Sequence, residues 1–209
     1  MKNNKILLLS PLVIVLISTL VAISFSKLIG KWAFIPIILT QWCLFTYFIH
    51  RFSSKEQIKN WLKPSQGSWG WSMLALLVGL IPLSVFIAHL DTLSSWTVWL
   101  PWILLAIINP WLEEFYWRGL LMDATNKWTS WASILFTSFF FSIHHAVFGI
   151  NSEVNSGFEV VIATFVMGIV WSVVYHKTKT LRWCIAAHFL VDFFNLSAAA
   201  FLDLFEKMS

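Results

Sequence analysis

The chain has 209 residues, of which 58% are hydrophobic, 17% are aromatic and only 11% are charged. Soluble domains usually carry about 25% charged residues, so this composition excludes a water-soluble globule and indicates an integral membrane protein. The formal net charge of +4 is modest, and we expect no nucleic-acid partner. Both cysteines, Cys43 and Cys184, lie in apolar runs and indicate neither a disulfide nor a cysteine metal site.

Seven stretches are apolar enough for a spanning helix, which needs about 20 mostly apolar residues. In chain order they cover about residues 6–26, 32–50, 70–90, 96–118, 128–148, 157–175 and 181–205. The first apolar run is longer than the roughly 7–15 residues of a signal-peptide core, so we expect it to be retained. Seven spans place the two termini on opposite sides of the membrane, whereas an eighth, less visible span would place them on the same side. The sequence therefore predicts an all-α polytopic transmembrane helix bundle of about seven spans.

The positions of Lys and Arg predict how the bundle is oriented. With the N-terminus inside, 11 basic residues fall on inside segments and only Lys27, Lys31 and Lys207 fall outside. Cytoplasmic loops carry an excess of basic residues, so this asymmetry indicates a multi-pass protein of the cell membrane with a cytoplasmic N-terminus. Residues 51–70, the only substantial polar stretch, are expected to form a cytoplasmic amphipathic linker.

Charged side chains inside a membrane helix cost about 2.5–3.5 kcal/mol, so those in the fourth span need an explanation. Glu114 and Arg118 are four residues apart and share a helix face, in the order that favours an ion pair. That pairing leaves Glu113, turned about 100° around the helix, as a carboxylate without a built-in partner and a candidate general base. Alternatively, both glutamates simply mark the membrane boundary.

Two later spans carry further polar groups. The fifth contains His144 and His145, of which at most one can share a face with a given partner. In the seventh, His188 and Asp192 share one face. Taken separately, each group has a purely structural explanation. The histidines of the fifth span would lie at a helix end, and the polar groups of the seventh would form a hydrogen bond between helices. Together, the groups on three helices can polarise a water and stabilise an oxyanion, as amide hydrolysis requires. Two histidines and two carboxylates could also form a four-ligand Zn²⁺ site.

The ordered motifs Glu-Glu-x-x-x-Arg, Phe-x-x-x-His and His-x-x-x-Asp resemble those of the CPBP family of intramembrane proteases. This family, also called the CAAX protease and bacteriocin-processing or Abi family, includes the Rce1-type prenyl-protein proteases. The resemblance covers about residues 96–200 and implies that a glutamate and a histidine activate the attacking water. Carried over residue by residue, it implies catalytic roles for Glu113, His145, His188 and Asp192 and a supporting pair of Glu114 and Arg118.

Several points of this assignment stay open. Phe140 with His144 also fits the second motif, although the small Ser142 favours Phe141 with His145. Rce1-like members carry Asn at the position of Asp192, and an ionised Asp would repel an oxyanion. Asp192 must then be protonated, orient His188 or bind a metal. Family members have been interpreted as glutamate-dependent without an essential metal, so no cofactor is assigned and Zn²⁺ remains an alternative.

Helix geometry disagrees with the assignment at one point. Counted from a hairpin near Asn126, Glu113 lies about 20 Å along the fourth span and His145 about 28 Å along the fifth. The two can meet only if the fifth span is tilted or bent, or begins later than residue 128.

The sequence thus predicts a CAAX-type intramembrane endopeptidase in a single integral membrane domain. Residues 1–95 are expected to form the N-terminal spans and linker, and residues 96–209 the protease-like core. Its substrate would be a protein or peptide, prenylated or carrying a leader, that arrives from the bilayer or the cytoplasmic side. The alternative is a non-enzymatic immunity or scaffold protein of the same fold, in which the polar residues only lock helices together.

Overall fold

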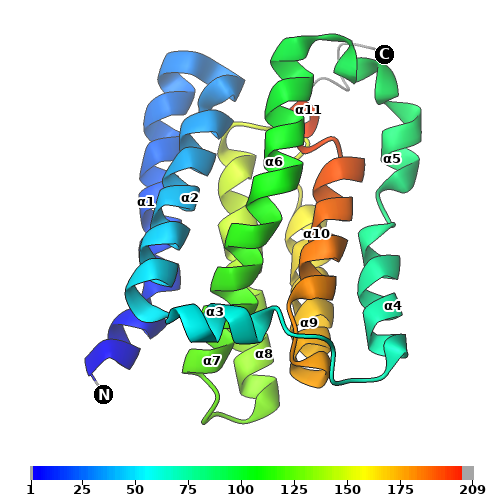
Figure 1. Ribbon diagram of the computed structural model, residues 1–209. Coiled ribbons are helices and arrows are strands. Elements are labelled where there is room, and N and C mark those ends of the chain that lie inside the picture. The colour runs from blue at the N-terminus through cyan, green and yellow to red at the C-terminus, as the bar shows by residue number, and fades with distance from the viewer. Residues whose placement is uncertain (1, 204–209) are drawn as a thin grey trace.

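The structure, a computed structural model, describes residues 2–203, and for residues 2–4 it describes the backbone alone. Within this range every regular element is a helix, which confirms the predicted all-α membrane class. Figure 1 shows long helices lying side by side along one axis, with short helices and turns at both ends of the bundle.

The chain begins with a helical hairpin. The helices α1 (Lys2–Ile29) and α2 (Phe34–Phe52) lie side by side (Figure 1) and are joined by the 3₁₀ turn η1 (Gly30–Ala33). This turn begins at Gly30, whose φ of 58° lies in the left-handed region that a residue without a Cβ adopts freely. On the outer side of α1, Leu28 is 75% exposed, as expected for a helix that faces lipid.

The polar linker forms α3 (Lys55–Trp61), which lies across one end of the bundle (Figure 1). Its N-terminus is capped by Ser54, whose hydroxyl accepts a hydrogen bond from the Gln57 backbone N–H at 3.1 Å. The next apolar stretch is split into α4 (Trp69–Gly79) and α5 (Leu83–Ala88). The split falls at Pro82, because proline has no N–H to continue the helical ladder.

The second half of the chain supplies the centre of the bundle. Its elements are η2 (Leu90–Ser94), α6 (Trp96–Glu114), the π-helical η3 (Phe115–Leu121), α7 (Met122–Ala124), α8 (Ser130–Ala146), η4 (Val147–Ile150), α9 (Phe158–Thr178), α10 (Arg182–Phe194) and α11 (Ser197–Phe201). The helix α8 packs against α9, and α10 packs against both α6 and α4. The three helices that carry the sequence motifs, α6, α8 and α10, therefore share the interior of the bundle.

Four described stretches are long and apolar enough to cross a membrane. They are Lys5–Phe52, which covers the α1–α2 hairpin from Lys5 onward, Trp69–Ala88, Ser130–Ile150 and Phe158–Thr178. The helix α10 has only 13 residues, and α6 carries two prolines and two glutamates, so neither qualifies by length and composition. The count of seven spans stays a prediction, and the last two residues of the seventh, 204 and 205, lie outside the described residues.

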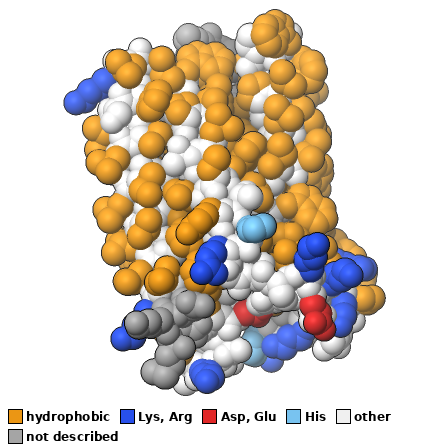
Figure 2. Space-filling model, turned by 60° about the vertical axis from the view of Figure 1, so that its left-hand side comes forward, with side chains coloured by type: hydrophobic (Ala, Val, Ile, Leu, Met, Phe, Trp, Pro, Cys, Tyr) orange, Lys and Arg blue, Asp and Glu red, His pale blue; other side chains and the backbone are white. Residues whose placement is uncertain are grey.

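Lys and Arg side chains gather at one end of the bundle, beside α3 (Figure 2). We call this end the basic face; it carries Arg51, Lys55, Lys59, Lys63, Lys127, Lys177, Lys179 and Arg182. We call the other end, formed by η1, η2, residues 151–157 and α11, the opposite face. This face carries Lys27, in the last turn of α1, and Lys31, in η1, whereas Lys207 lies outside the described residues. The positive-inside rule predicts that the basic face is the cytoplasmic one, and this orientation stays a prediction.

Gly119 of η3 and Trp61 of α3 approach each other closely, so α3 packs directly against η3. A Cβ built at Gly119 would lie 2.9 Å from two ring carbons of Trp61. The ring cannot easily move away, because its Nε1 donates a hydrogen bond to Asp123 Oδ2 at 2.9 Å and the side chain is buried. The structure therefore requires glycine at position 119.

We expect Gly119→Ala to lower the free energy of unfolding by about 1–3 kcal/mol, the usual cost of overpacking a filled core. The matched control is Gly70→Ala, because a Cβ at Gly70 would meet only Ser68 Oγ at 3.9 Å. Thermal unfolding of both variants in the same detergent measures the difference. Equal melting temperatures for the two variants would contradict the proposed contact.

Asp203 follows α11 and holds the loop at residues 152–154 on the opposite face. Its carboxylate accepts hydrogen bonds from the backbone N–H groups of Glu153 and Val154, at 2.9 and 3.0 Å, and from Ser152 Oγ at 2.8 Å. Lys31 Nζ lies 2.9 Å from its Oδ2. Burial by itself would raise the pKa of this carboxyl, but the donors and Lys31 outweigh it and lower the pKa of Asp203 below its ordinary value.

A carboxyl with a lowered pKa stabilises the folded protein above its unfolded-state pKa, and this contribution is lost as the pH falls through the lowered value. We therefore expect Asp203→Asn to melt at a lower temperature than the wild type at pH 7. The difference should shrink once the pH falls below the ordinary Asp pKa of 3.8. Melting curves of both proteins between pH 7 and pH 3 test this, and a gap that stays constant would contradict it.

Candidate active site

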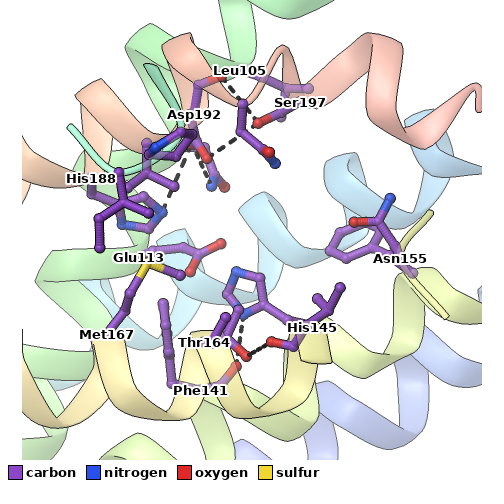
Figure 3. Close-up of a pocket in the computed structure, with 18 of the residues that line it drawn as sticks. Leu105, Glu113, Phe141, His145, Asn155, Thr164, Met167, His188, Asp192 and Ser197 are labelled. Atoms are coloured by element: carbon purple, nitrogen blue, oxygen red, sulfur yellow. Dashed lines mark hydrogen bonds and ion pairs between the residues drawn. The ribbon is translucent and has the colours of Figure 1, made fainter. Parts of the chain in front are cut away.

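A cavity of about 470 Å³ lies in the interior between α2, the α4–α5 break, α6, α8, α9 and α10. This volume is within the range of about 300–1,000 Å³ that is usual for ligand pockets. Its wall includes Glu113 of α6, His145 of α8, and His188 and Asp192 of α10. Figure 3 shows these four side chains turned toward the same space. The structure therefore brings together the four residues for which the sequence predicts catalytic roles.

The two adjacent glutamates of α6 have different surroundings. Glu114 is completely buried, and its Oε1 lies 2.8 Å from Arg118 Nη1, as the four-residue spacing predicts. Glu113 faces the cavity instead and is 2% exposed. Its Oε2 has no hydrogen-bond partner among the described residues. A buried carboxylate oxygen of this kind needs a donor, and a water molecule in the cavity can supply one.

Arg118, Phe141 and Trp171 pack together beside Glu114, and we call this layer the floor of the site. Its guanidinium pairs with Glu114 and also lies over the ring of Phe141, with Cζ 4.1 Å from the ring centroid. The same group lies 5.4 Å from the ring centroid of Trp171. Because Arg118 is fully buried, these contacts replace the water that its charge loses. The floor is thus rigid and closed to solvent.

His188 stands between two carboxylates. Its Nδ1 donates to Glu114 Oε1 at 2.9 Å, and its Nε2 lies 3.8 Å from Asp192 Oδ2. The ring also stacks on Trp171, at 5.0 Å between centroids. Since both nitrogens face acceptors, both can carry a proton, and the ring is held in one orientation by contacts on three sides.

The two histidines of α8 differ in position. His145 is partly buried on the cavity wall, and its Nδ1 lies 2.7 Å from the Phe141 carbonyl oxygen. A carbonyl can only accept, so Nδ1 is the donor and the neutral ring keeps its lone pair on Nε2. His144 is fully buried among Phe45, Trp117 and Phe148 and does not line the cavity. The structure therefore places His145, the histidine favoured by the sequence motif, at the cavity.

Glu113 and His145, which the predicted helix lengths placed at different heights, lie close together in the structure. Carboxylate and imidazole ligand atoms of Glu113, His144 and His145 lie within 4.8 Å of one another. One reason is that α8 begins at Ser130, so His145 is about 22 Å along it rather than 28 Å. A water that donates or accepts hydrogen bonds of about 2.8 Å can bridge groups separated by this distance.

The residues partly fit a metal ion. The predicted four-ligand set does not form, because His188 directs its nitrogens at Glu114 and Asp192. The group that comes together is Glu113, His144 and His145, and three protein ligands are the number that catalytic zinc sites use. The hydrogen bond from His145 Nδ1 to a backbone carbonyl is also the arrangement that orients metal-binding histidines.

Asn109 is a site residue that the sequence analysis missed. It lies one turn before Glu113 on α6, lines the cavity and donates from Nδ2 to Asp192 Oδ2 at 3.2 Å. Its Oδ1 accepts a hydrogen bond from Trp42 Nε1 at 3.0 Å, which fixes the orientation of the amide. A polar residue four positions before Glu113 in an apolar span is the signal that could have found it.

Comparison with known proteins is informative for the second half of the chain. A protein-family model, described as type II CAAX prenyl endopeptidase Rce1-like, matches residues 94–194. The matched range contains all six residues to which the sequence motifs assign roles. No curated protein matches the chain, and no solved structure matches it.

Proposed function

We propose that the chain hydrolyses a peptide bond with a water activated by Glu113 and His145. The match of residues 94–194 to the model of the Rce1-like type II CAAX prenyl endopeptidases supports this proposal. The family supports an intramembrane CAAX-type protease in general and does not favour a non-enzymatic scaffold. The substrate would be a membrane-associated protein or peptide, prenylated or carrying a leader segment.

One observation carries this proposal: a carboxylate with one unpartnered oxygen and an imidazole with a free lone pair lie close together at an interior cavity. Glu113 and His145 come from different helices, and their ligand atoms lie within 4.8 Å. In this arrangement Glu113 takes the proton of a water held between them while the water oxygen attacks the substrate carbonyl carbon. The protonated Glu113 can then deliver this proton to the leaving amine.

His188 and Asn109 are placed to stabilise the oxyanion that forms in this step. The Nε2 of His188 lies 3.8 Å from Asp192 Oδ2, and the Nδ2 of Asn109 donates to the same oxygen at 3.2 Å. In Figure 3, His188 and Asp192 lie across the cavity from His145. Hydrogen-bond donors fixed before the reaction stabilise developing negative charge without a reorganisation cost. The amide of Asn109 thereby offers the donor that an Asn at position 192 supplies in Rce1-like relatives.

Of the three roles left open for Asp192, its contacts favour orientation of His188. Its Oδ2 accepts from Asn109 and faces His188, and its Oδ1 lies 3.4 Å from Ser197 Oγ. Both oxygens therefore point at donors. An ionised Asp192 favours a proton on the Nε2 of His188, and the positive charge of the doubly protonated ring offsets the repulsion between Asp192 and an oxyanion. Because Nε2 is 3.8 Å from Asp192 Oδ2, longer than a hydrogen bond, its proton stays available to the oxyanion.

The metal alternative involves a different residue set. Glu113, His144 and His145 would hold the ion, which when bound would act as a Lewis acid and lower the pKa of its water. His188 and Asn109 would keep their place beside the carbonyl oxygen in either case. A chelator therefore separates the two alternatives.

The test is a cleavage assay on the purified protein in detergent, with a panel of prenylated and leader-type peptides. Wild type, His188→Ala and the exposed control His50→Ala are compared, each with and without a chelator. We expect cleavage by the wild type and by His50→Ala, loss of cleavage in His188→Ala and no effect of the chelator. Loss with chelator and recovery with Zn²⁺ would overturn the metal-free mechanism. No cleavage of any peptide would count against the enzyme and for a scaffold.

A further inference from the structure

The cavity extends from the site toward the opposite face and sideways toward the α4–α5 break, but not toward the basic face. Its wall is built from Ile38 near the start of α2, Thr164 in the second turn of α9, Val154 in the loop before α9, and Ser197 after α10. In Figure 1, α2 and α9 both begin at the opposite face, and α11 lies there as well. The open space therefore lies between Glu113 and the opposite face.

The path from the site to the basic face is filled. Directly below Glu113 lie Arg118, Trp117 and Trp171, whose exposed fractions are 0%, 0% and 1%. Beneath this layer, Trp61 packs against Gly119 and is 2% exposed. Among the described residues, none from α3, η3 or α7 lines the cavity. Water and substrate therefore have no open path to Glu113 from the basic face.

The cavity wall is exposed at two places. Val154, on the loop at the opposite face, is 38% exposed. Farther down, Ile81 at the α4–α5 break and Val166 on α9 are 70% and 52% exposed, and both lie in stretches apolar enough to cross a membrane. The cavity is therefore bordered by surface residues at the opposite face and, on its lateral side, at the apolar surface of the α4–α5 break and α9.

We propose that the site is reached from the face opposite the basic one, and that its substrate is a membrane-embedded apolar peptide segment. The segment enters sideways between the α4–α5 break and α9, where the wall is apolar, and the attacking water enters past Val154. The scissile bond then lies in the half of the bilayer away from the cytoplasm. That a peptide segment is the substrate rests on the proposed function, whereas the access route to Glu113 rests on the cavity alone.

The test uses cysteine labelling with a membrane-impermeant thiol reagent on oriented vesicles. The background variant is Cys43→Ser, which removes the exposed thiol, while the buried Cys184 is kept. Thr164→Cys places a thiol of similar size inside the cavity. Two exposed reference positions report the two faces: Glu153→Cys on the loop of the opposite face and Asn60→Cys on α3 at the basic face.

We expect Thr164→Cys to be labelled from the same side as Glu153→Cys, and Asn60→Cys only from the other side. Labelling of Thr164→Cys from the side of Asn60→Cys would overturn the proposal, and so would no labelling from either side, since the cavity would then be closed to water. Labelling does not depend on proteolysis. A protein that fails the cleavage assay but labels as expected would refute the proposed function and leave the access route standing.

Discussion

Replacing Glu113 with Gln is expected to lower kcat for peptide cleavage by a factor of about 10²–10⁴, the usual contribution of a general base. The amide has nearly the same shape as the carboxylate but cannot take a proton from water. Because Glu113 Oε2 has no partner among the described residues, the substitution breaks no contact there. Initial rates on a cleaved peptide, with the protein reconstituted in liposomes, measure the effect.

The matched control is Glu159→Gln, which changes an exposed glutamate in the first turn of α9. It should retain the wild-type rate, and both variants should melt within a few degrees of the wild type. A rate for Glu113→Gln within a factor of three of the control would rule out Glu113 as the base.

Replacing Arg118 with Leu is expected to lower the free energy of unfolding by about 3–5 kcal/mol, because it leaves a buried charge without its partner. Arg118 pairs with Glu114 at 2.8 Å, and Glu114 in turn accepts from His188 at 2.9 Å. Loss of the guanidinium also removes the contact with Phe141. Denaturant unfolding in mixed micelles measures the change.

The control for this variant is Arg51→Leu, because Arg51 is exposed on the basic face, with its Cζ 5.5 Å from the centroid of the neighbouring Phe52 ring in a cation–π arrangement. A surface arginine of this kind should contribute well under 1 kcal/mol. If the two variants lost the same stability, Arg118 would not hold the floor of the site.

Contacts within one helix could be predicted from the sequence, because helical spacing fixes them. The four-residue spacing places Glu114 on Arg118 and brings His188 near Asp192, and both pairs are found. The same periodicity separates Glu113 from its neighbour and turns it toward the cavity. These are local consequences of 3.6 residues per turn, so no knowledge of the tertiary structure was needed.

Contacts between helices could not be predicted in this way. The pairing of His188 with Glu114 depends on how α10 packs against α6, and the hydrogen bond of Asn109 with Trp42 joins residues 67 positions apart. The π-helical η3 is likewise not coded by the apolar pattern, although it follows the site directly. Which side the cavity extends toward is a property of the packed bundle. Of the two expected routes, from the bilayer and from the cytoplasmic side, the lining favours the bilayer.

The central claim is that Glu113 and His145 act on one water as a single unit. A double-mutant cycle tests it most directly, with the cleavage rates of Glu113→Gln, His145→Ala and the double variant measured on one peptide. Residues that act as a unit are strongly non-additive, so the double variant should be about as slow as the slower single variant. If instead the two losses multiplied, the residues would act independently, and the shared water would be contradicted.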